Sequence, residues 1–132
     1  MRFNHVANRL DARHFETVVE MFRTQLDFVL LRRTERAVWL RQPGATIDLQ
    51  FSRSPTEARD ADKLRSQVSF LSETPREALA ALAAWFGDRG LAAEVGAYSD
   101  REFYLDVPDA FVDFVVEAMR PELADYGDVP GL

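Results

Sequence analysis

The chain has no cysteine among its 132 residues. Disulfide bonds, thiolate metal ligands and cysteine nucleophiles are therefore excluded. A protein without disulfides suits a reducing compartment. The amino-terminal stretch also lacks the long apolar run of a signal peptide, so we expect a cytoplasmic protein.

Long apolar runs and excess positive charge are missing as well. No apolar run approaches the roughly 18 residues that a membrane-spanning helix needs. The formal net charge is −6, and so acidic a chain repels the phosphate backbone of nucleic acids. The arginines between Arg32 and Arg41 alternate with apolar residues, which favours a solvated strand face over a binding patch. We therefore expect neither a membrane nor a nucleic-acid partner.

The hydrophobic content is sufficient for a globular core. Hydrophobic residues make up 47% of the chain, and the length fits a single domain over residues 1–132. The order strand, helix and three strands occurs twice, in about 3–53 and about 63–121. A polar stretch without periodicity, 54–62, reads as a linker between them. The sequence thus predicts an α+β fold of two βαβββ repeats.

The first repeat carries a helix followed by three strands. Asp11 can cap a helix whose apolar stripe is formed by residues at helical spacing, namely Phe15, Val18, Val19, Phe22 and Leu26. Strands are predicted over 28–31, 37–40 and 46–51, with a Pro43-Gly44 turn before the last.

The second repeat restarts with a strand over 64–71. Thr74, Pro75 and Glu77 form a capping box with proline at the first helical position. Extended segments follow at 91–97, 102–107 and 111–119. The stretch 109–119 can also be written as a capped helix, although its valines and its alternation favour a strand.

Six short motifs resemble the vicinal oxygen chelate superfamily, which includes glyoxalases, bleomycin-resistance proteins and extradiol dioxygenases. They follow the order and spacing of that superfamily from Phe3 to about Met119, and they are His5-Val6-Ala7, 21–28, 44–49, 67–70, 85–91 and 103–109. The resemblance implies that the two βαβββ repeats form curved mixed sheets around a cavity, with a small-molecule cavity in each half.

The resemblance also implies where a metal would bind. The four ligand positions of metal-dependent relatives fall on His5, Asp48, Gln67 and Phe114. Phenylalanine is no ligand and glutamine is a weak one, so the metal site is incomplete. A shift by one residue would replace Phe114 with Asp113, and a divalent metal held by His5, Asp48, Gln67 and Asp113 stays an alternative.

Two functions follow from these residues. The favoured one is a metal-free protein that binds a small organic molecule, with Asp48 hydrogen-bonded to His5 or Gln67 at the polar end of the cavity. The ligand-binding residues are expected to be His5, Asp48, Gln50, Gln67, Tyr104 and Phe114. The alternative is a divalent-metal-dependent lyase, isomerase or dioxygenase.

A homodimer is also expected. Repeats of about fifty residues form a thin core, and open sheets leave edges that proteins usually pair or cover. The resemblance points the same way, because relatives commonly dimerise.

Overall fold

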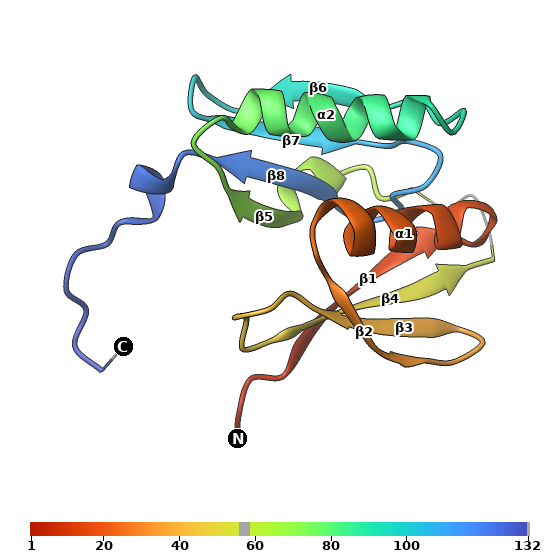
Figure 1. Cartoon of the computed structure of the whole chain (residues 1–132), viewed down its shortest axis with the longest axis horizontal. Helices are drawn as coiled ribbons and strands as arrows, with labels where there is room; N and C mark the ends of the chain where they lie inside the picture. Colours follow the sequence, from red (N-terminus) through yellow and green to blue (C-terminus); the bar gives the residue numbers. More distant parts are fainter. Residues whose placement is uncertain (56–58, 132) are drawn as a thin grey trace.

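The protein consists of two four-stranded sheets, each accompanied by one long helix (Figure 1). A computed structural model describes residues 1–55 and 59–131. The strand orders are β1-β4-β3-β2 and β5-β8-β7-β6, with the first two strands of each order parallel and the others antiparallel. The predicted pair of βαβββ modules is confirmed. Of the expected linker 54–62, residues 56–58 lie outside the described residues.

The first module runs through β1 (His5–Asp11), a short 3-10 turn η1 (Ala12–His14), α1 (Phe15–Gln25), β2 (Val29–Arg33), β3 (Ala37–Arg41) and β4 (Asp48–Ser54). Residues of one parity on β3 and β4 pack with the apolar stripe of α1, and they include Val38, Leu40, Leu49 and Phe51. The other parity forms an open face that carries Trp39, Arg41, Asp48 and Gln50.

The second module contains η2 (Lys63–Arg65), β5 (Gln67–Leu71), α2 (Pro75–Gly87), β6 (Glu94–Ala97), β7 (Glu102–Asp106), β8 (Val115–Met119) and η3 (Pro121–Ala124). Its sheet packs on α2 through Phe103, Leu105, Val116 and Ala118. In Figure 1, α1 lies between the two sheets and α2 covers the second sheet.

Both predicted helix caps differ from the structure. Asp11 accepts a hydrogen bond from the Arg13 N–H at 2.9 Å and so caps the 3-10 turn rather than α1. Thr74 stands at the N-cap of α2 without a side-chain capping bond, and Pro75 begins the helix. The helix therefore starts with the fixed φ of proline and not with a capping box.

The last extended segment is a strand, as favoured, but a shorter one than predicted. Residues 115–119 form β8, whereas 108–114 turn before entering it. The carbonyl of Val107 accepts from the N–H groups of both Ala110 and Phe111 at 2.9 Å, which closes this turn. The predicted strand over 64–71 likewise starts late, at Gln67, because η2 precedes it.

The turn before β8 joins the two modules. Leu10 bridges to Phe111, Asp11 N–H donates to Ala110 O at 2.9 Å, and Val112 N–H donates to Arg9 O at 3.2 Å. Asp113 accepts from the backbone N–H of Arg9 at 3.0 Å and from its Nε at 3.2 Å. The end of β1 is thus paired to the chain that leads into β8.

Three phenyl rings continue this junction into the core. Phe114 lies between Phe51 of β4 and Phe111, with ring centroids 5.5 and 4.5 Å apart, and all three are fully buried. A single buried cluster therefore spans both modules. Burial and offset stacking together hold the modules in one position.

An ionic cluster covers the same junction. Asp11 is 2% exposed and receives two hydrogen bonds from the Arg13 guanidinium, at 3.1 and 3.0 Å. Arg59 adds a contact at 3.3 Å and also donates its Nε to Pro108 O of the second module. The Arg13 hydrogen bonds, helped by Arg59, hold the pKa of Asp11 well below its usual range although burial raises it.

Replacing Phe114 by alanine tests the shared core. The large cavity left between Phe51 and Phe111 should lower the free energy of unfolding by about 3–5 kcal/mol, as for other buried phenylalanines. Urea unfolding measures the change, with the exposed Val129→Ala as control. A loss of less than about 1.5 kcal/mol would contradict the stacking of Phe114 between Phe51 and Phe111.

Replacing Asp11 by asparagine tests the ionic cluster. Because the folded-state pKa is depressed, the carboxylate stabilises the fold above its unfolded pKa of about 4, and this stabilisation is lost as the pH falls. Asp11→Asn should lower the free energy of unfolding by about 1–2 kcal/mol at pH 7 and by much less near pH 2. The loss at pH 7 is modest because Arg13 is partly in solvent, which weakens the ion pair. Asp100→Asn, at an exposed carboxylate, is the control. An equal loss at both pH values would contradict the assignment.

Candidate functional site

A cavity of about 550 Å³ lies between the two modules. Its walls come from β1, the β3–β4 turn and β4 on one side and from β5 on the other. The resemblance led us to expect one cavity within each half. This cavity instead lies between the two halves, which corrects that expectation. Its apolar lining includes Val6, Phe28, Ile47, Leu49, Val68 and Phe70, and its polar lining consists of Asn8, Gln42, Asp48, Ser66, Gln67 and Ser69.

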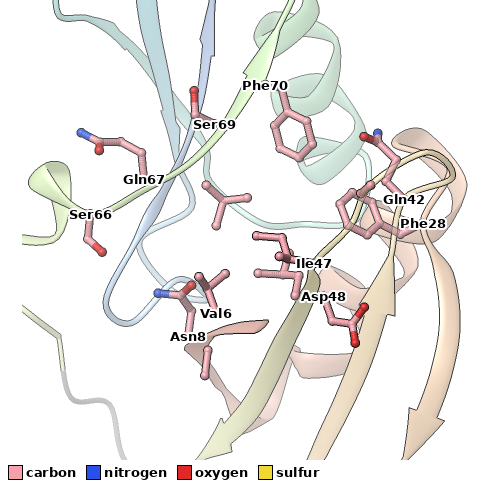
Figure 2. A pocket seen from close by; sticks show the side chains of 14 residues that line it. Val6, Asn8, Phe28, Gln42, Ile47, Asp48, Ser66, Gln67, Ser69 and Phe70 are labelled. Carbon is pink, nitrogen blue, oxygen red and sulfur yellow. The ribbon is translucent and has the colours of Figure 1, made fainter. Parts of the chain in front are cut away.

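The apolar side chains occupy the interior of this cavity and the polar groups its edge. Figure 2 shows Val6, Ile47 and Phe70 directed toward the middle of the space. The amide of Gln67 and the hydroxyl of Ser69 point away from it (Figure 2). Phe28 packs edge-on against Phe70 at 6.2 Å and closes one end. The site can therefore enclose an apolar group.

The structure places His5, Asp48 and Gln50 on the open face of the first sheet. His5 of β1 is the cross-strand neighbour of Asp48 in β4, and Gln50 lies two residues further along. The exposed His5 ring has its Nδ1 2.9 Å from Asn4 Oδ1. Asp48 lines the cavity, whereas His5 and Gln50 are not among its lining residues.

Asp48 has a partner that the sequence reasoning missed. Arg41 Nε donates to Asp48 Oδ1 at 2.6 Å, so the carboxylate is bound to a guanidinium and not to His5 or Gln67 as expected. The carboxylate is 9% exposed and stabilises the charged Arg41, whose pKa is raised by this hydrogen bond. Leu40 pairs with Leu49 in the β3–β4 hairpin, which places Arg41 next to Asp48. The predicted Pro43-Gly44 turn between the two residues was the available signal.

Gln67 and Tyr104 belong to the open face of the second sheet. Gln67 Nε2 donates to Leu64 O at 3.0 Å and to the Tyr98 hydroxyl at 3.3 Å, and Tyr98 in turn donates to Leu64 O. Burial raises the pKa of Tyr98, and the charge of Glu117 adds to this rise. The Tyr104 ring lies 5.1 Å from that of Tyr98. Gln67 lines the cavity, and Tyr104 is not among its lining residues.

Glycine at position 96 makes room for Tyr104. A Cβ atom at Gly96 would lie 2.2 Å from Tyr104 Cζ, so the ring crosses the neighbouring strand β6 at close range. Glu117, which pairs with Tyr104 in register, accepts a hydrogen bond from the Ser69 hydroxyl at 2.7 Å. Glu117 is a polar residue of this face that the sequence reasoning did not select.

The remaining candidates lie elsewhere. Phe114 is buried in the shared core between Phe51 and Phe111. Asp113, its proposed substitute as a metal ligand, is bound by Arg9 and by Asn8 Nδ2 at 3.3 Å. Neither residue is brought together with Gln67 in the cavity.

These residues do not fit a divalent metal. Asp48 and Asp113 are neutralised by Arg41 and Arg9, and Gln67 is held by Leu64 and Tyr98. Within residues 1–55 and 59–131, no group of three or more histidine, aspartate or glutamate side chains is arranged to hold a metal ion. A catalytic zinc normally needs about three protein ligands, so the superfamily's ligand positions do not form such a site here.

No family model and no curated protein matches the sequence. Solved structures do match it over most of their length. A possible glyoxalase from Bacillus cereus is 16% identical with a TM-score of 0.58, covering 90% of this chain and 98% of its own. The fosfomycin resistance protein FosX from Listeria monocytogenes, complexed with Mn(II) and sulfate, is 8% identical with a TM-score of 0.60, covering 90% and 89%.

A third structure of this kind holds a small molecule. The bleomycin-binding protein from Streptomyces verticillus, complexed with copper(II)-bleomycin, is 17% identical with a TM-score of 0.53, covering 91% of this chain and 98% of its own. At these identities the likeness concerns the fold. The resemblance indicated by the sequence motifs is therefore confirmed at that level: the chain has the fold of the glyoxalase, bleomycin-resistance and dioxygenase proteins.

Proposed function

We propose that the protein binds a small organic molecule in the cavity between its two modules, without a metal. The observation that carries this proposal is the apolar interior of the 550 Å³ cavity, whose lining also includes the polar side chains of Asn8, Gln42 and Ser66. Ligand pockets in proteins commonly measure about 300–1,000 Å³ and combine an apolar lining with a few polar groups.

The comparisons support a binding function and leave the ligand open. One neighbour of this fold is a bleomycin-binding protein, and another, from Streptomyces, is described as an antibiotic-binding protein. The same fold therefore serves as a small-molecule binder in those proteins. In this chain the pairing of Asp48 with Arg41 favours binding over metal chemistry, because it occupies the carboxylate that a metal would need.

An uncharged fluorophore, N-phenyl-1-naphthylamine, tests the cavity. Ala45 lines it from an exposed turn, so Ala45→Trp should fill the space and lower the affinity about tenfold or more. Ala61→Trp, at an exposed residue outside the cavity, is the matched control and should change the affinity less than about twofold. Fluorescence titration measures both. Equal affinity in the two variants would place the binding site elsewhere.

The alternative function is a divalent-metal-dependent lyase, isomerase or dioxygenase. The observation in its favour is that His5 lies directly across from Asp48 on one sheet face. Elemental analysis of protein purified without chelator decides between the two functions. We expect well below one metal ion per chain. Near-stoichiometric zinc, nickel or iron that is lost in His5→Ala would promote the enzyme.

A homodimer and a cytoplasmic location remain proposals. The edge strands β2 and β6 carry exposed Val29, Leu31 and Val95, which a second copy could cover. Sedimentation velocity at micromolar concentration should show a dimer, and a monomer would refute the dimer proposal.

As for location, none of the helices within 1–55 and 59–131 has the length and apolar character of a membrane span.

A further inference from the structure

A second cavity of about 450 Å³ adjoins the first one. It lies between the end of α1, the face of α2 and the strands β5 and β8, and its walls include Leu26, Ala78, Leu79, Ala81 and Leu82. Phe70 and Gln42 line both cavities. The two spaces therefore adjoin, with Phe70 and Gln42 between them.

The residues of this partition can yield to a ligand. Phe70 is only half-buried and touches Phe22 and Phe28 edgewise or tilted, at 6.4 and 6.2 Å between ring centroids. Gln42 donates its Nε2 to Leu26 O at 2.9 Å, which leaves its carbonyl oxygen available as an acceptor. A rotation of the Phe70 side chain would connect the two cavities into one long space.

Asp27, two residues after the end of α1, is an exposed residue of the second cavity's lining. Among the described residues that line this cavity it alone carries a charge, and none of the described residues forms an ion pair with its carboxylate. Its φ is +60°, where glycine or asparagine is usual just after a helix. A negative charge is also disfavoured at a helix carboxyl terminus. An exposed carboxylate beside an apolar space suits the recognition of a cation.

We propose that the two adjoining cavities take an elongated apolar amine, with its hydrocarbon part along both of them and its ammonium group at Asp27. This inference rests on the proposed binding function and adds the ligand class, the second cavity and the residue that selects the charge. The apolar walls recognise the chain of the molecule, and the carboxylate favours an ammonium group over a neutral or anionic head.

Calorimetric titration with straight-chain alkylamines from butylamine to dodecylamine tests the length of the site. Each added methylene should raise the affinity about three- to fourfold until both cavities are filled. Ala81→Phe, which narrows the second cavity from an exposed position on α2, should end this gain at a shorter chain. Ala80→Phe, exposed on the same helix but outside the cavity lining, should leave the gain unchanged.

Asp27→Asn tests the charge, because asparagine tolerates the left-handed backbone and removes only the carboxylate. It should weaken decylamine about threefold to fivefold and leave decanol unaffected. Equal effects on both ligands, or a chain-length series that is the same in Ala81→Phe and in the parent, would overturn the inference. If the alkylamine tests fail but the naphthylamine probe still binds and is still blocked by Ala45→Trp, the proposed binding function stands without the amine inference. If the probe does not bind either, the binding function and the amine inference are both wrong.

Discussion

The stacking of Phe114 between Phe51 and Phe111 is the interaction on which the rest of the structure depends. Each module has a sheet and a helix, yet neither has the buried area of an independent domain of ordinary size. The three rings place apolar surface from both modules in one core, and the β1 bridge to residues 110–112 fixes their relative position. Because the modules meet there, the space between them has a defined width.

The repeat and the nature of its elements could be predicted from the sequence because periodicity reports which face of an element is buried. The stripe that includes Phe22 and the alternation around Val68 and Phe70 both correspond to buried or half-buried faces in the structure. The boundaries were harder to predict. The turn at 107–114 is built mostly from apolar residues, so its composition resembles that of the strand that follows.

The site was less predictable than the fold because it depends on contacts between distant segments. The positions of Asp48 and Gln67 at the cavity follow from their strands. The burial of Phe114 does not, since it depends on how the turn before β8 packs on the first module. The pairing of Asp48 with Arg41 depends on the register of a hairpin, and it changes the chemistry of the carboxylate from a metal ligand to an ion-pair partner. The alternation of apolar and polar residues shows which face of a sheet a residue lies on, but it does not show which residue of another strand lies beside it.

The bridge between β1 and residues 110–112 has a consequence for how the chain reaches its native state. Asn8 contacts Asp113, which is 105 positions away. During synthesis the end of β1 therefore stays uncovered until residues 110–113 have been made and can pair with it. Contacts of such long sequence separation slow folding, because a large loop must close before they form. Until then the first module exposes the apolar surface of Leu10 and Phe51, and exposed apolar surface of this kind makes incomplete chains prone to aggregation.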